Sequence, residues 1–197
     1  MSSLRETQAF FAVRASGWEE RFPEDGPAYQ QAVWELAPAA GARILDAGCG
    51  TGRALPLLRA AAGPTGHVVG LDITPEMLAE ARRLGRQEAA SLVRADGGQL
   101  PFGDGSFHAV FAAGFLPHLE TAEGGLAELA RITAPGGRLA IFHPIGRATL
   151  AARHGASYSD AGATSPKRLP GLLAEAGWQL ESIDDADHRY LALATRC

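Results

Sequence analysis

The strongest constraint on the fold is the segment ILDAGCGTG at residues 44–52, a short apolar run that ends in three alternate glycines. An apolar run of this length, bounded by glycines, is typical of a buried parallel strand. Glycine allows the backbone to turn sharply and to approach a ligand where a side chain would collide. In an open parallel sheet this turn lies at the carboxyl end of a strand, where ligands bind. The segment therefore predicts a ligand site on an α/β sheet.

The chain on both sides of this segment alternates short apolar runs with helical patterns, which indicates repeated strand-helix units. Strands are expected at 43–48, 67–73, 91–96, 107–114, 137–144, 178–184 and 189–195, and helices at 28–37, 52–62, 75–85, 122–134 and 168–178. The short connection between the last two strands favours an antiparallel hairpin. We therefore predict an α/β, Rossmann-like fold with a seven-stranded, mostly parallel sheet, helices on both faces and a C-terminal antiparallel hairpin.

A chain of 197 residues is expected to form a single domain. Residues 1–40 are interpreted as an N-terminal lid and a leading helix packed on the core, and residues 41–197 as the main domain. Residues 145–166 lack a clear period and follow the fifth strand, so they are expected to cross the mouth of the site. The Pro135-Gly136-Gly137 run is predicted to form the turn before that strand.

The composition restricts the partners and the compartment. The net charge is −4 and there are only two cysteines. An acidic chain offers no field that attracts a phosphate backbone, so nucleic acid is not expected as a partner. No apolar window approaches the length of about 20 residues that a membrane span needs. With no signal-peptide pattern at the amino terminus, the sequence favours a cytoplasmic protein that does not bind a membrane.

Three acids follow or end three successive predicted strands, at Asp46, Asp72 and Asp96. Asp72 lies 20 residues beyond Gly52, the position from which a carboxylate accepts hydrogen bonds from both hydroxyls of a ribose. A single such Asp commonly caps a turn. Three aspartates at neighbouring strand ends, on the same edge as a glycine-rich turn, favour a nucleoside-binding site at that edge of the sheet.

At this point the chain resembles the class I S-adenosylmethionine-dependent methyltransferases, particularly the group that acts on small molecules. The resemblance rests on four segments in the correct order: LDAGCGTGR (45–53), VVGLDITPEML (68–78), RADGGQLPFGDGSFHAVFAA (94–113) and LAELARITAPGGRLAI (126–141). One departure is His108, where the family usually has Asp. The resemblance implies S-adenosyl-L-methionine as the cofactor, with S-adenosyl-L-homocysteine as its product.

The resemblance also implies which residues bind the cofactor. Asp46 with the backbone of Gly48 and Gly50 would hold the methionine part, and Asp72 would hold the ribose. Ile73 and Met77 would contact the adenine ring. Asp96 and the backbone amide of Gly97 would form hydrogen bonds with its exocyclic amine and ring nitrogen. The set expected to bind the cofactor is completed by Gly52 and Ala113. No metal is expected, because the end of the fourth strand lacks a cluster of acidic ligands.

Methyl transfer needs a base only if the acceptor carries a proton at the working pH. His118 follows the fourth strand and His143 ends the fifth, so both are candidate catalytic residues. The leader and the segment after the fifth strand supply the candidates for substrate binding: Trp18, Phe22, Tyr29, Arg147 and Tyr158. Solvent-facing side chains, pocket-shaping histidines and core packing of Met77 remain the alternatives to these roles.

The leading hypothesis is therefore an enzyme that methylates a small organic acceptor, as a monomer or a homodimer. A nicotinamide oxidoreductase would need a glycine at position 53, which is Arg53, and a Tyr-x-x-x-Lys pair, whereas Lys167 is the only lysine. A third hypothesis is a protein that binds S-adenosylmethionine without transferring the methyl group, because a cofactor pocket can persist without an acceptor site.

Overall fold

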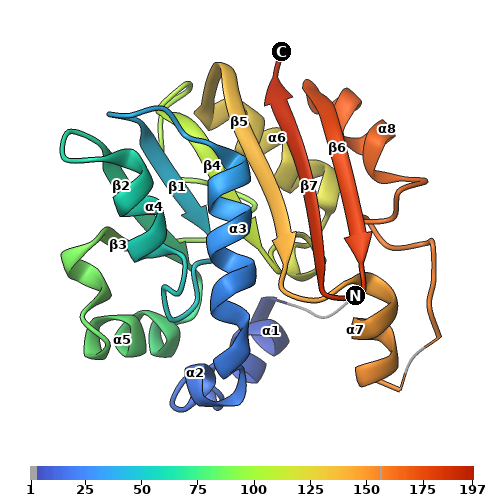
Figure 1. The fold of residues 1–197 in the computed structure, drawn as a ribbon, viewed down its shortest axis with the longest axis horizontal. Coiled ribbons are helices and arrows are strands. Elements are labelled where there is room, and N and C mark those ends of the chain that lie inside the picture. Colours follow the sequence, from blue (N-terminus) through green and yellow to red (C-terminus); the bar gives the residue numbers. More distant parts are fainter. Residues whose placement is uncertain (1–3, 156) are drawn as a thin grey trace.

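The computed structural model describes residues 4–155 and 157–197 and contains a single seven-stranded sheet (Figure 1). The strands are β1 (Arg43–Ala47), β2 (His67–Asp72), β3 (Ser91–Arg94), β4 (Phe107–Ala113), β5 (Thr133–His143), β6 (Trp178–Ala186) and β7 (Arg189–Arg196), in the order β3-β2-β1-β4-β5-β7-β6. The first five strands pair in parallel, and β7 pairs antiparallel with both β5 and β6. The predicted fold class is confirmed.

Helices cover both faces of the sheet. The α-helices are α1 (Leu4–Ala12), α2 (Trp18–Arg21), α3 (Gly26–Leu36), α4 (Leu55–Ala62), α5 (Pro75–Arg83), α6 (Ala122–Ile132), α7 (Arg147–Arg153) and α8 (Leu169–Glu175). Short 3-10 turns are η1 (Pro23–Asp25), η2 (Arg86–Glu88) and η3 (Leu116–His118). In Figure 1, α3 and α4 lie in front of the sheet, whereas α6 and α8 lie behind it.

The core consists of two apolar clusters, one on each face of the sheet. In β1, Ile44 packs in the cluster that contains side chains of α3 and α4, and Leu45 packs in the cluster that contains those of α6 and α8. Consecutive side chains of a strand point to opposite faces. Because both faces are covered, every position of this strand after Arg43 is buried, which explains the continuous apolar run in the sequence.

The beginning of β5 differs from the prediction. The helix ends at Ile132, two residues earlier than expected, and the strand already begins at Thr133. The pairing with β4 then jumps from Phe107–Thr133 to Ala109–Arg138. Gly136 has a positive φ of 75° within this irregular stretch. The Pro-Gly-Gly run therefore forms a bulge inside the strand rather than a turn before it.

Other segments also differ from the prediction, among them α1 and α2, which lie in the predicted lid, where no helix was expected. Helix α7 falls in the stretch for which no helix was predicted, because none of its seven residues is buried and no apolar period marks it. Strand β3 ends at Arg94, and Asp96 lies beyond it, where Oδ1 accepts a hydrogen bond from the Gly98 N–H at 2.9 Å. Asp96 is thus a turn residue, unlike Asp46 and Asp72, which lie within β1 and β2.

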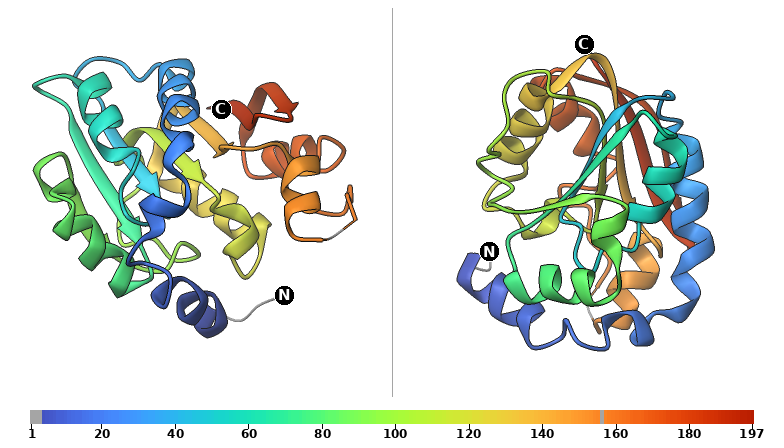
Figure 2. Two further views of the ribbon diagram at one scale, coloured as in Figure 1. Left: turned by 60° about the horizontal axis from the view of Figure 1, so that its bottom comes forward. Right: turned by 90° about the vertical axis from the view of Figure 1, so that its left-hand side faces the viewer.

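Residues 4–25, which we call the N-terminal strap, cross the edge where the parallel strands end (Figure 2). Helix α3 follows the strap and packs against α4 and the strands β4, β5 and β7. Of the predicted N-terminal unit, residues 1–3 lie outside the described residues. None of the helices in the described chain is long and apolar enough to cross a membrane.

Candidate functional site

The glycine-rich turn follows β1 at the carboxyl edge of the sheet. Gly48, Gly50 and Gly52 all have positive φ values, of 70°, 55° and 81°, which favour glycine. The turn is fastened to the neighbouring strand because the Cys49 N–H donates to the Leu71 carbonyl at 2.8 Å. The local sequence thus produces the tight turn that its spacing predicts.

The three glycines have different surroundings. A Cβ on Gly50 would have only the Met77 Sδ as a neighbour, at 4.0 Å. A Cβ on Gly48 would lie 2.9 Å from the Phe115 ring, and one on Gly52 would lie 2.7 Å from Leu55 Cδ1. An added Cβ would thus meet close neighbours at Gly48 and Gly52, whereas the space beside Gly50 is open to a ligand.

Asp72 links the end of β2 to the glycine-rich turn. Its Oδ2 accepts a hydrogen bond from the Gly50 N–H at 2.9 Å, and its Oδ1 accepts one from the Thr74 N–H at 2.7 Å. Burial raises the pKa of Asp72, and these backbone N–H groups oppose that increase. Each oxygen retains a second lone pair, so the carboxylate can also accept hydrogen bonds from a ligand hydroxyl.

Asp46 is the most unusual polar group near the turn. It is 1% exposed, and its Oδ2 has no hydrogen-bond partner within the described part of the protein. Burial, with the nearby charge of Asp72, raises the pKa of Asp46 to about 8. A buried carboxyl oxygen without a partner is costly, and a cationic ligand beside it would remove that cost.

The side expected to bind adenine contains the other predicted cofactor residues. Met77 is 2% exposed, and Ile73 is half-buried, with its carbonyl accepting a hydrogen bond from Gln8 Nε2 of α1 at 3.0 Å. Gly97 is buried, and a Cβ there would lie 2.4 Å from the Phe115 ring. Phe115 thus contacts both Gly48 and Gly97.

Sequence reasoning missed Phe115, because an apolar residue after a strand gives no signal of its own. It follows β4 and is 8% exposed. Ala113, predicted to bind the cofactor, is the last residue of β4 and pairs with Phe142 of β5. The structure therefore brings this end of β4 to the same edge as the glycine-rich turn.

S-adenosylmethionine fits the residues present at this edge. Its methionine ammonium matches the unpartnered Asp46 Oδ2, and the space beside Gly50 accommodates a ligand. Asp72 Oδ1 and Oδ2 have the acceptor capacity for ribose hydroxyls. Among residues 4–155 and 157–197, no three His, Cys, Asp or Glu side chains form a metal-binding group.

The two candidate catalytic histidines lie at neighbouring strand ends. His143 ends β5 and is half-buried, with its Nδ1 2.9 Å from the Ile145 carbonyl oxygen. Burial, assisted by the charges of His154 and Arg153, lowers the pKa of His143. His118 lies in η3 with its ring edge-on to that of Phe11 at 5.0 Å between centroids. His118 is partly exposed, and the burial of the rest of its side chain lowers its pKa.

Aromatic side chains of the strap form a connected row. Phe11 contacts Trp18 with ring centroids 5.6 Å apart, and Trp18 contacts Phe22 at 5.2 Å. Tyr29 of α3 packs edge-on against Phe142 at 4.9 Å. Burial and the nearby charge of Asp46 raise the pKa of Tyr29. Trp18 and Phe22 thus form one aromatic group with Phe11, whereas Tyr29 belongs to a second group with Phe111 and Phe142.

Arg147 and Tyr158 hold each other in place. Arg147 Nη1 donates to the Tyr158 hydroxyl at 2.9 Å and to Asp185 Oδ2 at 3.3 Å, and Nη2 donates to the Ser159 carbonyl at 2.7 Å. The Arg147 side chain is only 11% exposed. Most of its donors are therefore used within the protein, which leaves little capacity for an acidic substrate.

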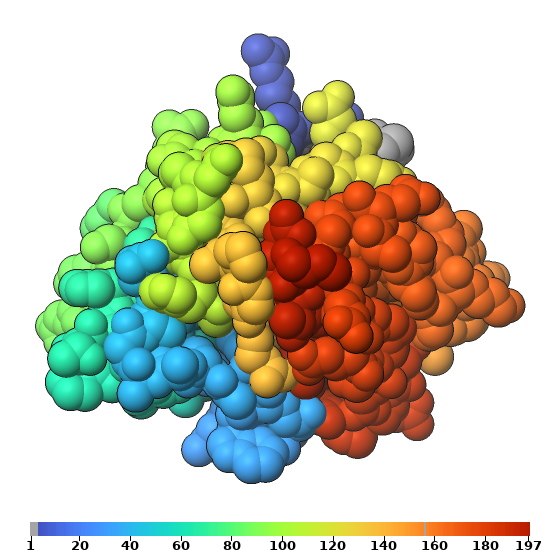
Figure 3. Space-filling model, turned by 90° about the horizontal axis from the view of Figure 1, so that it is seen from above, coloured from blue at the N-terminus to red at the C-terminus, as the bar shows by residue number. Residues whose placement is uncertain are grey.

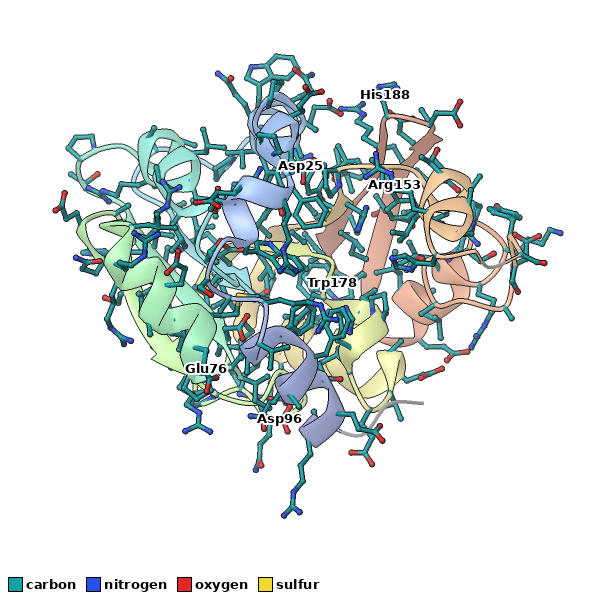
Figure 4. All side chains as sticks on the ribbon, turned by 90° about the horizontal axis from the view of Figure 1, so that it is seen from below. Asp25, Glu76, Asp96, Arg153, Trp178 and His188 are labelled. Atoms are coloured by element: carbon teal, nitrogen blue, oxygen red, sulfur yellow. The ribbon has the colours of Figure 1, made fainter. Side chains whose placement is uncertain are left out.

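Figure 4 looks onto this edge of the molecule, with Asp25 of η1 and Arg153 of α7 at one side and Asp96 near α1 at the other. The charge of Arg153 acts on both Asp25 and His143. Arg153 is exposed and forms no ion pair with the described residues. It is thus a freer cation than Arg147.

Two surface hollows lie elsewhere, at the end where the parallel strands begin. One is lined by Asp104, Arg131 and Arg196 among others, and the second by Arg59, Gly66 and His67 among others. Figure 3 looks onto that end, where the C-terminal residues lie beside β5. Neither hollow includes a residue of the glycine-rich turn, so neither belongs to the candidate site.

A family model described as "Methyltransferase domain" matches residues 45–141. The O-methyltransferase cnsE of Penicillium expansum is 35% identical over 159 residues, which are 76% of this chain and 56% of that protein. A demethylmenaquinone methyltransferase of Thermus thermophilus is 44% identical over 104 residues, 51% of this chain and 46% of that protein. The chain thus spans about half the length of the curated relatives it matches.

Among solved structures, a SAM-dependent methyltransferase from Aquifex aeolicus superposes with a TM-score of 0.74. It shares 19% sequence identity, and the match covers 94% of this chain and 98% of that chain. The similarity to this structure concerns the fold. The segment that matches the family model, residues 45–141, includes the glycine-rich turn, Asp72 and the end of β4. By fold and by sequence, the chain belongs to the class I S-adenosylmethionine-dependent methyltransferase family.

Proposed function

We propose that the protein transfers a methyl group from S-adenosylmethionine to a small organic acceptor. The observation that carries this proposal is the buried, unpartnered Asp46 Oδ2 next to a glycine-rich turn with open space at Gly50. The names of the relatives, an O-methyltransferase and a demethylmenaquinone methyltransferase, support a small organic acceptor.

The cofactor-binding roles in this proposal follow the edge of the sheet. Asp46 and the backbone of Gly48 and Gly50 hold the methionine part, and Asp72 holds the ribose. Ile73, Met77 and Phe115 enclose the adenine. Further contacts to the cofactor come from Gly52, Asp96, Gly97 and Ala113.

The cofactor supplies a methyl group already activated by a sulfonium. The protein's contribution is to align the acceptor and to exclude water, and positioning of this kind accounts for ~7–11 kcal/mol of a reaction barrier. Trp18, Phe22 and Tyr29 form the wall against which a flat or apolar acceptor packs. Arg147 and Tyr158 shape the opposite side through their mutual hydrogen bond.

His143 accepts the proton of the acceptor in this proposal. His143 Nδ1 lies 2.9 Å from the Ile145 carbonyl oxygen and 3.2 Å from the Ile145 backbone nitrogen. In this proposal Nδ1–H donates to the carbonyl, the shorter of the two contacts, and the Nε2 lone pair is free. A lowered pKa keeps the imidazole neutral at pH 7, the form that a base needs. His118, fixed against Phe11, shapes the pocket beside it.

The first experiment compares ligands by thermal shift. S-adenosylhomocysteine should raise the melting temperature, and NAD should not, because a ligand that binds only the folded state stabilises it. A rise with NAD alone would replace the proposal with an oxidoreductase.

A metabolite screen with mass detection of the added methyl group then tests transfer. Binding of S-adenosylhomocysteine without methylation of any acceptor across a broad screen would favour a protein that only binds the cofactor.

A further inference from the structure

Arg53 occupies the position where a dinucleotide fingerprint has its third glycine, and none of the cofactor roles above uses it. Its guanidinium points away from the turn toward the N-terminal strap. Nη2 forms an ion pair with Glu19 Oε2 at 3.0 Å, and Nη1 donates to the Phe22 carbonyl at 2.5 Å. Arg53 also lies over the Tyr29 ring, 5.8 Å from its centroid. Arg53 thus contacts Phe22 and Tyr29 directly, and it contacts Glu19, the chain neighbour of Trp18.

Thr51 of the same turn strengthens this connection. Its hydroxyl donates to Glu19 Oε1 at 2.7 Å, so both carboxylate oxygens of Glu19 are held by the turn. The side chains of Arg53 and Glu19 are 12% and 27% exposed. Charge-assisted hydrogen bonds in such a half-buried place are screened less by solvent than those of a surface pair.

Few side chains of the strap are buried. Among residues 4–25, only Thr7 and Ala15 are buried, and no residue of α2 or η1 is buried. Phe10 and Val13 are 48% and 74% exposed. A segment with so few buried apolar contacts belongs to the least stable part of a fold. The polar contacts to Arg53 and Thr51 hold the α2 end of the strap. Packing of α1 against α5, with Gln8 and Phe11, holds its other end.

We propose that Arg53 is a positioning residue that couples the cofactor turn to the acceptor wall: ligand bound at the turn orders the strap, and the docked strap retains the ligand. The turn and the strap share one set of hydrogen bonds, so ordering either of them favours the other. This inference rests on the proposed function for the identity of the ligand. It implies that binding of the cofactor and completion of the acceptor wall favour each other.

The test uses S-adenosylhomocysteine as the probe and the variant Arg53→Met, which keeps an apolar stem but removes all guanidinium contacts. The matched control is Arg21→Met, because Arg21 lies on the strap, is exposed and forms no ion pair with the described residues. One measurement is the dissociation rate of S-adenosylhomocysteine by stopped flow. The other is the rate at which chymotrypsin cuts the strap, with and without the ligand.

We expect S-adenosylhomocysteine to leave Arg53→Met at least about tenfold faster than wild type, at a similar melting temperature. The ligand should protect the strap of wild type and of Arg21→Met from chymotrypsin, but not that of Arg53→Met. Arg53→Lys keeps one cation toward Glu19 and should give an intermediate rate. Adding Glu19→Gln to Arg53→Met should have little further effect, because both changes remove the same contact.

An unchanged dissociation rate together with unchanged protection of the strap in Arg53→Met would overturn the proposal. Failure of the proposed function looks different, since wild type itself would then not bind S-adenosylhomocysteine. In that case the cleavage of the ligand-free strap still decides the role of Arg53: equal cleavage of wild type and Arg53→Met would show that Arg53 does not hold the strap.

Discussion

The Gly50 N–H donates a hydrogen bond to Asp72 Oδ2 at 2.9 Å, across 22 positions of sequence. This bond ties the turn after β1 to the end of β2, because Asp72 also accepts from the Thr74 N–H at the start of α5. The acid expected to bind the ribose therefore also fixes the shape of the turn that approaches the ligand.

Replacing Asp72 by Ala should weaken the binding of S-adenosylhomocysteine strongly. The variant loses two hydrogen bonds to the ribose, each worth about 1.5–3 kcal/mol for a charged acceptor. It also leaves the Gly50 and Thr74 N–H groups without their acceptor. Calorimetry compares the affinities, and Asp187→Ala, in the exposed hairpin loop, is the control. Unchanged affinity in Asp72→Ala would remove Asp72 from the ribose site.

Gly50→Val should abolish cofactor binding and leave a folded protein. The side chain enters the space beside the turn, where an added Cβ would have only Met77 Sδ as a neighbour, at 4.0 Å. The positive φ adds a strain of roughly 1–3 kcal/mol. Gly85→Val is a matched control, because Gly85 also has a positive φ and has no neighbour within 4 Å of an added Cβ. If both variants bind S-adenosylhomocysteine equally well, the space beside Gly50 is not the cofactor site.

His143→Ala should separate binding from turnover. Loss of a positioned base lowers the turnover of the acceptor found in the screen by ~10²–10⁴, while the affinity for S-adenosylhomocysteine stays nearly constant. Because burial lowers the pKa of His143, the acidic limb of the wild-type rate should have its midpoint below the ordinary value of 6.5. His188→Ala, in the exposed hairpin loop, should behave as wild type. A joint loss of binding, turnover and thermal stability in His143→Ala would make His143 a structural residue.

The free energy of unfolding should change with pH because Asp46 has different pKa values in the folded and unfolded states. Its pKa rises from 3.8 to about 8 in the folded protein, so between these pH values the folded state keeps a proton that the unfolded chain has lost. The free energy of unfolding therefore falls as the pH rises through this window. Asp46→Asn stays neutral, so its stability relative to wild type should increase from about pH 4 to about pH 8.

Urea unfolding at a series of pH values measures this difference. Asp187→Asn, at an exposed position of the hairpin loop, serves as the control and should show no such trend. A stability difference between Asp46→Asn and wild type that does not change with pH would mean that Asp46 is already ionised in the folded protein.

Much of the sheet was predictable because both of its faces are covered. Each parallel strand is then a nearly continuous apolar run, and Gly, Pro, Asp and Thr mark where it stops. Asp46 and Asp72 lie within β1 and β2 as the sequence predicts. The Pro-Gly-Gly bulge in β5 and the helix α7 were not predicted correctly, since a bulge needs a pairing partner and α7 buries none of its residues.

The sequence by itself determined the order of the strands and of the helices α3, α4, α5, α6 and α8, the glycine-rich turn and the family resemblance, because periodicity and φ preferences are local properties of the chain. Only the tertiary structure decided which side chains meet at the site. Phe115 against Gly48 and Gly97, Arg147 held by Asp185, and Arg53 joined to Glu19 are contacts between segments distant in sequence. A long-range contact depends on how the helices pack on the sheet, and neither the type nor the spacing of the residues encodes it.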